Sequence, residues 1–342
     1  MGERRIAVIL CNLGGPDGPD AVRPFLFNLF NDRAIIGAPQ PVRMLIAQLI
    51  SRARESSAKA NYARMGGGSP IVPETQAQAN ALDAALAGRV PGAAFKCFLA
   101  MRYWRPFAKD AARAAAEWGA TEAIVLPLYP QFSSTTTRSS MDAWRKASSL
   151  PSSVICCYPT QASFARAHAD AILAAWRDGG SPPAPRVLFS AHGLPQRVIE
   201  SGDPYQWQVE QTVAAVKPLL PADWSFRTCY QSRVGPLAWI GPSTEEEIER
   251  AGADGQGVIV SPIAFVSEHI ETLVELDVEY AEKAQELGVP YYLRAPALGA
   301  ADSFIETLAE RVACAAARRA DIVGPAEGRY CPAQFGLCPH PV

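Results

Sequence analysis

Apolar runs of strand length alternate with amphipathic stretches along almost the whole chain, and this alternation constrains the fold more than any other feature. Several runs are continuous, as in Val187-Leu188-Phe189 and Val258-Ile259-Val260. Continuous apolar runs are typical of strands that are buried on both faces of a parallel sheet. The stretches between them, for example 76–86 and 164–176, repeat their apolar residues at helical spacing. The sequence therefore predicts an α/β fold with doubly wound parallel sheets.

Composition excludes several classes of protein. The net charge of -2 leaves no basic surface for nucleic acid, so we expect no nucleic-acid partner. No apolar stretch approaches the roughly 20 residues that a membrane-spanning helix needs. The apolar run at 6–10, which follows Arg4 and Arg5, is too short for the core of a signal peptide. We therefore expect a cytoplasmic protein whose eight cysteines are reduced thiols.

Four polar clusters follow predicted strands directly, at 12–16, 101–104, 190–195 and 267–271. In open α/β sheets, ligands bind just beyond the carboxyl ends of the strands. The positions of these clusters therefore predict one shared site.

His192 is the histidine best placed for chemistry. It follows a predicted buried strand and has small neighbours, Ala191 and Gly193, which leave its ring room to face a ligand. An imidazole accepts a proton near neutral pH because its reference pKa is about 6.5. A histidine in this place can equally cap a turn by bonding to the backbone. The residues alone leave both interpretations open.

A predicted helix over 267–287 carries an acidic stripe. At roughly 100° per residue, five carboxylates fall on one side: Glu268, Glu271, Glu275, Glu279 and Glu282. Like charges four residues apart repel, so the stripe is mildly unfavourable unless a cation visits it. The two alternatives are a solvated helix face and a path that handles cations.

Two neighbours of this stripe do not fit it. His269 lies well off the carboxylate side of the helical wheel, so it joins the same site only if the first helical turn is irregular. Asp277 falls within the apolar arc of the same wheel, and a buried carboxylate needs a partner. The sequence does not identify that partner.

Residues 22–49 are rich in large apolar side chains, with Arg23, Arg33 and Arg43 interspersed. The segment can form two helices packed into the core. It can also form an apolar lip that contacts a flat ligand or a membrane surface.

Taken together, the motifs resemble those of one family, the ferrochelatases. The resemblance extends over roughly residues 5 to 310 and keeps the family's order. Its motifs are Asn-Leu-Gly-Gly-Pro at 12–16, Gly-Gly-Gly-Ser-Pro at 66–70, Met-Arg-Tyr-Trp at 101–104, Leu-Tyr-Pro-Gln-Phe-Ser at 128–133, Ser-Ala-His-Gly-Leu-Pro at 190–195, Gly-Asp-Pro-Tyr at 202–205, Gln-Ser-Arg-Val-Gly-Pro at 231–236 and His-Ile-Glu-Thr-Leu at 269–273. The 190–195 and 269–273 motifs are the most specific. The resemblance implies two similar Rossmann-like domains, 1–160 and 161–320, with a porphyrin cleft between them and a tail at 321–342.

The resemblance also implies an activity. Ferrochelatases insert Fe²⁺ into protoporphyrin IX to form protohaem with release of two protons, which is the last step of haem biosynthesis. The segment at 265–277 looks more like the proteobacterial and mitochondrial enzymes than like those that use coproporphyrin. The alternatives are a chelatase for another tetrapyrrole or metal, such as coproporphyrin or cobalt, and a tetrapyrrole-binding protein without catalysis.

Carried over position by position, the resemblance assigns roles to individual residues. His192 and Glu271 match the catalytic histidine and its acidic partner, and His269 and Glu275 join them as residues that handle the metal. The positions that line the cleft or contact the macrocycle are Leu13, Tyr62, Arg102, Tyr103, Ser133 and Trp239. Arg102 can pair a propionate bidentately. The 22–49 segment would be the porphyrin-binding lip and a peripheral contact with the inner membrane.

No cofactor is expected for catalysis, because Fe²⁺ is a substrate. Some family members also hold a [2Fe-2S] cluster through one internal cysteine and further cysteines in the tail, and such a cluster usually needs four thiolates. This tail has only Cys331 and Cys338, and Ser134 stands where the animal enzymes have the internal cysteine. The two tail cysteines are therefore candidate ligands that need Cys156 or Cys157 to help complete the set.

Overall fold

A computed structural model describes the chain except for residues 1–3, 184, 234, 236 and 341–342. The chain forms two compact units that are interleaved in sequence. The first unit contains Met1–Tyr129, Ser133–Cys157 and Leu308–Gly324, and the second contains Pro130–Phe132, Tyr158–Thr307 and Pro325–Val342. The contiguous division at 160 and 320 stays a prediction. None of the described helices is long and apolar enough to cross a membrane.

The first unit is built on a parallel sheet with the strand order β2-β1-β3-β4-β9. Its strands are β1 (Arg4–Asn12), β2 (Ala93–Met101), β3 (Glu122–Pro127), β4 (Ser152–Ile155) and β9 (Ile322–Val323). The central strand β1 is fully buried from Ile6 to Leu10, as its continuous apolar run predicts. β9 brings the start of the predicted tail into this sheet, where Ile322 pairs with Val154.

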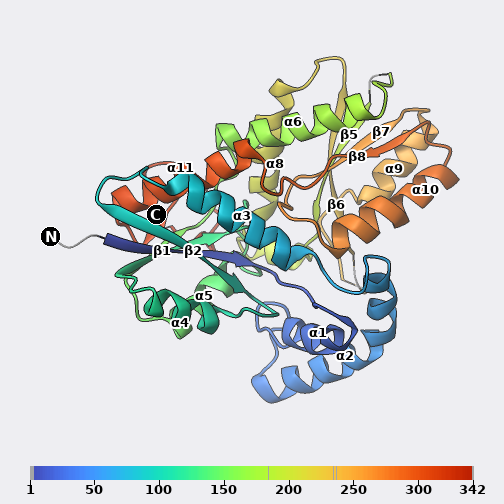
Figure 1. Cartoon of the computed structure of the whole chain (residues 1–342). Helices are drawn as coiled ribbons and strands as arrows, with labels where there is room; N and C mark the ends of the chain where they lie inside the picture. The colour runs from blue at the N-terminus through green and yellow to red at the C-terminus, as the bar shows by residue number, and fades with distance from the viewer. Residues whose placement is uncertain (1–3, 184, 234, 236, 341–342) are drawn as a thin grey trace. The chain divides into compact units, whose positions relative to one another are not determined.

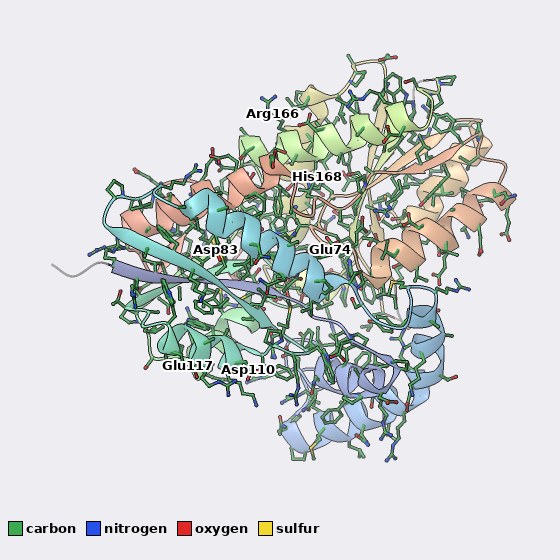
Figure 2. All side chains as sticks on the ribbon, viewed as in Figure 1. Glu74, Asp83, Asp110, Glu117, Arg166 and His168 are labelled. Atoms are coloured by element: carbon green, nitrogen blue, oxygen red, sulfur yellow. The ribbon has the colours of Figure 1, made fainter. Side chains whose placement is uncertain are left out.

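Helices cover both faces of this sheet, with α3 on one face and α4 and α5 on the other (Figure 1). The helices of this unit are α1 (Val22–Phe30), α2 (Gln40–Ala63), α3 (Ile71–Leu86), α4 (Ala108–Glu117), α5 (Thr137–Ala147) and the part of α11 (Asp302–Arg318) that starts at Leu308. Figure 2 labels Asp83 on α3 and Asp110 on α4. Asp83 accepts a hydrogen bond from the backbone N–H of Cys97 in β2 (2.8 Å), and Asp110 accepts one from Phe107 at the start of α4 (3.0 Å). These carboxylates fasten the two helices locally.

The second unit contains a parallel sheet with the order β6-β5-β7-β8. Its strands are β5 (Arg186–His192), β6 (Ser225–Gln231), β7 (Val258–Pro262) and β8 (Tyr292–Arg294). Its helical segments are α6 (Ala162–Asp178), α7 (Gln196–Glu200), α8 (Tyr205–Val216), α9 (Thr244–Ala253), a π-helical segment (Glu271–Glu279), α10 (Tyr280–Glu286) and the start of α11.

Successive residues of β5 pack on opposite layers of helices. Val187 and Phe189 lie in a core cluster with residues of α6 and α8, whereas Leu188 lies in another with residues of α9 and α10. Side chains alternate across a strand, so a run with no polar position needs a helical layer on each face. Both sheets are parallel and flanked by helices, which confirms the predicted α/β fold class.

Beyond β9, the C-terminal segment is packed against the second unit. Trp207 of α8 lies against the rings of Tyr330 and Phe335, with centroids 5.1 and 5.6 Å away. The Arg329 side chain donates hydrogen bonds to four backbone carbonyls of its own segment, those of Cys331, Pro332, Phe335 and His340. The segment therefore holds a defined shape although it contains no helix or strand after Val323 within its described residues.

Candidate functional site

His192 ends β5, and the backbone around it sets the orientation of its ring. Its Nδ1–H donates to the carbonyl of Gly193 (2.5 Å), and its own carbonyl accepts from the Tyr205 hydroxyl at the start of α8 (3.0 Å). A ring whose Nδ1 carries the proton presents the lone pair of Nε2 on its other side. Nε2 is therefore the ring nitrogen that faces away from this backbone bond, and the side chain is 35% exposed.

Gly193 allows a close approach beside this histidine. A Cβ atom there would lie 2.9 Å from the carbonyl oxygen of Gln231 and 3.2 Å from the Trp239 ring. Backbone bonds from Gln196 to Ala238 (2.8 Å) and from Ile240 to Leu194 (3.0 Å) hold the Trp239 loop against the loop that follows β5. The predicted porphyrin residue Trp239 thus lies next to His192 within the second unit.

Glu271 lies between two histidines. Its Oε1 is 3.6 Å from Nε2 of His192, and its Oε2 is 3.5 Å from Nε2 of His269. His269 is 6% exposed, and its Nδ1–H donates to the carbonyl of Ser267 (3.1 Å). Both imidazoles therefore use Nδ1 on the backbone and turn Nε2 towards the same carboxylate. The fold brings these three predicted residues together.

His269 lies outside the helix to which the helical wheel assigns it. A regular helix places His269 off the carboxylate stripe, but the nine residues from Glu271 to Glu279 form a π-helix, with more residues in each turn. His269 precedes this segment, and its carbonyl accepts from both Thr272 (3.1 Å) and Leu273 (2.9 Å), a shared arrangement that is common at helix ends. The sequence pattern placed His269 off the carboxylate stripe on the assumption of a regular helix, and that assumption does not hold at this residue. π-Helical turns occur frequently at functional sites.

Glu271 is held in its ionised form. Burial raises the pKa of its carboxyl, but the charge of His192 and the hydrogen bond and charge of His269 outweigh burial and lower that pKa to about 2. A carboxylate beside two imidazoles stabilises either ring when it takes up a proton. The trio can therefore accept a proton at an imidazole nitrogen and keep the resulting charge balanced.

Glu275, one turn along, has a different environment. It accepts four hydrogen bonds, from the backbone N–H of Ser232 (2.9 Å), the hydroxyl of Ser232 (2.6 Å), the Gln231 amide (3.0 Å) and the Tyr280 hydroxyl (2.9 Å). Burial and the negative charge of Glu271 nevertheless raise the pKa of Glu275. Ser232 holds a left-handed backbone conformation, with φ at 67°, to offer both of its donors.

The remaining carboxylates of the predicted stripe separate from this pair. Glu279 and Glu282 are exposed. Glu268 instead pairs with Arg294 of β8 at 2.6 Å.

The interpretation of Asp277 as part of the apolar arc is wrong. The residue is exposed, and its two carboxylate oxygens accept from Nε and Nη2 of Arg294, each at 2.6 Å. Arg294 is the partner that the helical pattern could not identify. It belongs to a strand that follows in sequence and pairs with Asp277 only through the tertiary fold.

Five of the predicted porphyrin residues lie in the first unit: Leu13, Tyr62, Arg102, Tyr103 and Ser133. The backbone N–H groups of Arg102 and Tyr103 bond the carbonyls of Asn12 and Leu13, so the 12–16 and 101–104 motifs are adjacent as predicted from their strand ends. Tyr62 and Ser133 are buried, and the Ser133 hydroxyl bonds that of Thr135 (2.9 Å).

Sequence reasoning missed Asp32, which is buried beside this group. Its Oδ2 accepts from Nη2 of Arg102 (2.7 Å), the hydroxyl of Tyr103 (2.9 Å) and the hydroxyl of Ser139 (2.5 Å). The surrounding sequence, Asn-Asp-Arg, reads as an ordinary turn between two apolar helices. The only available signal was a single acidic residue inside an apolar segment.

The other histidines and cysteines do not add a metal centre. His168, labelled on α6 in Figure 2, is packed edge-on against Phe164, and burial lowers its pKa to about 3. Across the described residues, no three or more His, Cys, Asp or Glu side chains gather in a way that could hold a metal ion.

Cys331 and Cys338 lie together in the C-terminal segment of the second unit. The hydrogen bond with Cys331 lowers the pKa of Cys338 to about 6, although burial opposes this. The Cys331 sulfur also accepts from the Gln208 amide of α8 (3.1 Å).

Solved structures identify the class of fold. SirB from Bacillus subtilis, solved with Fe³⁺, superimposes with a TM-score of 0.53 at 12% identity, covering 92% of this chain and 98% of that protein. CbiX, the terminal enzyme of sirohaem biosynthesis in denitrifying bacteria, gives a TM-score of 0.51 at 15% identity, covering 91% and 99%. At such identities the likeness concerns the fold alone, which is the two-domain α/β fold of chelatases.

Sequence comparison then identifies the family. The ferrochelatase family model matches residues 5–316. Ferrochelatase from Caulobacter vibrioides strain NA1000 is 56% identical over 338 residues, covering 98% of this chain and 97% of that protein. Ferrochelatase from Rickettsia bellii strain OSU 85-389 is 45% identical over 344 residues, covering 99% and 96%. This chain belongs to the ferrochelatase family.

Proposed function

We propose that this chain inserts Fe²⁺ into protoporphyrin IX, forming protohaem with the release of two protons as the last step of haem biosynthesis. The proposal is supported by family membership over residues 5–316 and by the ferrochelatase name of relatives that are 56% and 45% identical. The observation that carries it is the carboxylate of Glu271 between the Nε2 atoms of His192 and His269. Fe²⁺ is a substrate of this reaction, so the enzyme is a metal-chelating lyase that needs no cofactor for it.

The chemistry requires a base close to a site that tolerates a cation. Two pyrrole N–H protons must leave the macrocycle, and Fe²⁺ must exchange its water for the pyrrole nitrogens. Nε2 of His192 faces Glu271 at 3.6 Å, and the ionised Glu271 would compensate the charge when that nitrogen takes a proton. We assign His192 as the proton acceptor and Glu271 as its ionised partner.

His269 and Glu275 extend this group. A neutral imidazole and a carboxylate are both ligands for iron, so His192, Glu271, His269 and Glu275 are the residues that Fe²⁺ would contact in transit, although their side chains in the described part of the chain are not arranged as a resident metal site. Because burial and Glu271 raise the pKa of Glu275, this second carboxyl takes up a proton more readily than Glu271. It is therefore the better acceptor for protons that leave the site.

Porphyrin contacts are proposed from the family pattern together with the placements above. Trp239 would contact the macrocycle beside His192, and Leu13 would face its plane. Tyr62, Tyr103 and Ser133 would line the binding surface from the first unit. Arg102 would pair a propionate. Its Nε and Nη2 already bond Ser139 and Asp32, which leaves the Nη1 end of the guanidinium for a substrate carboxylate.

The test is anaerobic incubation with Fe²⁺ and protoporphyrin IX, followed by absorption spectra. The native chain should form haem, and His192→Ala and Glu271→Gln should each lower kcat by on the order of 100-fold or more. Glu279→Gln, an exposed carboxylate of the same π-helical segment, is the matched control and should retain activity. Porphyrin binding without metallation would contradict the proposal. Coproporphyrin and Co²⁺ serve as competing substrates in the same assay.

We also propose that the chain contacts the inner membrane peripherally through α2, which agrees with the absence of a spanning helix among the described residues. Four apolar side chains at the start of α2 are about half exposed or more: Val42, Met44, Leu45 and Leu49. The exposed cations Arg33 and Arg52 lie close to them in sequence, which suits anionic lipid headgroups.

Leu45→Glu should abolish flotation with anionic liposomes. Leu219→Glu, an exposed leucine elsewhere, should not. Equal flotation of both variants would contradict the proposal.

For the [2Fe-2S] cluster, we propose Cys331 and Cys338 as two of its ligands. Their donor chemistry fits, because they are adjacent thiols and the pKa of Cys338 is lowered to about 6. A second adjacent pair, Cys156 and Cys157 with sulfurs 3.5 Å apart, lies in the first unit. A cluster would give visible absorption and acid-labile sulfide in anaerobically purified protein, lost in Cys338→Ser and kept in Cys314→Ser. Colourless protein without sulfide would contradict it.

A further inference from the structure

The guanidinium of Arg102 is held by a hydrogen bond and an ion pair to two different elements. Its Nε donates to the hydroxyl of Ser139 (2.6 Å), and its Nη2 donates to Oδ2 of Asp32 (2.7 Å). The Ser139 hydroxyl itself donates to the same Asp32 oxygen (2.5 Å). One edge of the guanidinium is thus fixed by two partners that are also bonded to each other. The Arg102 side chain as a whole stays 26% exposed.

Asp32 is in turn held firmly by its own turn between α1 and α2. Its Oδ1 accepts from the backbone N–H of Ala34 (2.9 Å), and its carbonyl accepts from Ile35 (3.1 Å) and Ile36 (2.9 Å). Its side chain is 6% exposed. Burial raises the pKa of Asp32, but the hydrogen bonds from Ser139 and Ala34 and the charge of Arg102 outweigh this and lower it. A buried, ionised carboxylate with this many donors is a rigid support.

Tyr103 joins the same carboxylate from another direction. Its hydroxyl donates to Oδ2 of Asp32 (2.9 Å), and its backbone carbonyl accepts from the side chain of Asn28 in α1 (3.0 Å). The guanidinium of Arg102 lies over the Tyr103 ring, 5.0 Å from its centroid. Asp32 therefore connects the α1–α2 turn, the loop after β2 and the start of α5 at a single oxygen atom.

We infer that Asp32 is a positioning residue for recognition of a substrate carboxylate: it fixes one edge of Arg102 so that the remaining N–H groups meet a porphyrin propionate in a set geometry. This inference rests on the proposed function and on the assignment of Arg102 to a propionate. Asp32 also neutralises Arg102 before substrate binds, which avoids an unpaired cation in a partly buried place. Asp32 itself does not contact the substrate in this account.

The test measures binding of metal-free protoporphyrin IX and of its dimethyl ester by fluorescence quenching. Asp32→Asn keeps the size of the side chain and removes its charge. We expect it to weaken binding of the dicarboxylic acid by roughly 10- to 100-fold, the usual effect of losing a charged hydrogen bond. Binding of the ester should change little, because the ester cannot form the ion pair. Arg102→Leu should show the same selectivity, and adding Asp32→Asn to it should cost nothing further.

Two further variants distinguish a specific effect on binding from a loss of folding. Ser139→Ala removes the partner of Nε of Arg102 and one donor to Asp32 but keeps the Arg102–Asp32 ion pair, so it should give a smaller loss of the same selectivity. Asp142→Asn, an exposed acid on the same helix, is the control and should bind both porphyrins like the native chain. In turnover, Asp32→Asn should raise KM for protoporphyrin IX and leave kcat nearly unchanged.

The outcomes separate this inference from the function on which it rests. Equal weakening of acid and ester by Asp32→Asn would overturn it in favour of a purely structural role, and unchanged binding of the acid would overturn it outright. If the native chain binds porphyrin but forms no haem, the proposed function fails. The binding comparison still decides whether Asp32 positions Arg102.

Discussion

At the scale of single residues, two glutamates one helical turn apart acquire opposite properties from their neighbours. Glu271 lies between His192 and His269, and their positive charge lowers its pKa to about 2 against the effect of burial. Glu275 receives only neutral donors, and burial and the charge of Glu271 raise its pKa. The same helical segment therefore carries one carboxyl that stays ionised and another that takes up a proton more readily.

The lowered pKa of Glu271 predicts a pH-dependent contribution to stability. Its folded-state pKa of about 2 is below the unfolded value of about 4.3, so the contribution is present above the unfolded value and is lost as pH falls towards 2. Acidification from about pH 5 to 2 should lower the free energy of unfolding of the native chain more than that of the Glu271→Gln variant. Urea unfolding at each pH measures both. Parallel stability curves for the two proteins would contradict this.

Gly193 predicts a steric effect next to His192. Gly193→Ala would place a Cβ 2.9 Å from the Gln231 carbonyl and 3.2 Å from the Trp239 ring, so the ring or the histidine loop must move. We expect a loss of about 1–3 kcal/mol in the free energy of unfolding, a change in tryptophan fluorescence and weaker porphyrin binding. Gly18→Ala, which meets no atom within 4 Å, should leave all three unchanged. Unaltered fluorescence in Gly193→Ala would argue against the contact.

At the scale of secondary-structure elements, the π-helical segment depends on a strand that follows it. Arg294 of β8 pairs with Asp277 inside the segment and with Glu268 just before it, and its side chain is 13% exposed. These ion pairs hold both sides of the turn that carries His269 and Glu271. The turn that carries these two residues is therefore supported from outside the helix.

Replacing Arg294 should therefore weaken the fold and the site together. Arg294→Met leaves the 18%-exposed Glu268 side chain without its cation, and we expect a loss of about 3 kcal/mol in unfolding free energy. Asp277→Asn removes only the more exposed partner and should cost less than about 1 kcal/mol. Urea denaturation compares the two variants. Equal losses would show that Glu268 does not depend on Arg294.

At the scale of the whole molecule, the end of the chain contributes to both units. β9 extends the sheet of the first unit through its pairing with β4, and residues from Pro325 onward are packed on the second unit. There, Tyr330 and Phe335 cover Trp207 of α8, and Cys331 accepts a hydrogen bond from Gln208. α8 begins at Tyr205, whose hydroxyl bonds the carbonyl of His192, so the segment supports the helix next to the site.

Truncation after Gly324 should therefore destabilise the second unit while keeping β9. Removing the rings that cover Trp207 should lower the free energy of unfolding by about 3 kcal/mol, comparable to deleting one large aromatic side chain from a core. Chemical denaturation followed by tryptophan fluorescence measures the change. Phe335→Ala should give part of the same loss in the full-length chain. A truncated protein with unchanged stability would show that the packing contributes nothing.

Much of the fold and part of the site could be predicted from the sequence. Buried-strand runs such as Val187-Leu188-Phe189 predict parallel sheets because their pattern is local, and the strand-end position of His192 follows from the same pattern. The place of Asp32 beside Arg102 could not be predicted, because the two residues are 70 positions apart and are joined only by packing. The porphyrin roles of Leu13, Tyr62, Arg102, Tyr103, Ser133 and Trp239 stay predictions, carried by motif resemblance.

By itself, the sequence determined the α/β class, the family, the cluster at the end of β5 and the acidic character of residues 268–282. Periodicity and motifs are properties of residues that are neighbours along the chain, so they can be recognised without knowledge of the fold. Only the tertiary structure decided that His269 reaches Glu271, that Asp277 turns outward to Arg294, and that Glu271 and Glu275 differ in pKa. Each of these depends on a group brought from another element or on a π-helical turn, and a regular helical wheel contains neither.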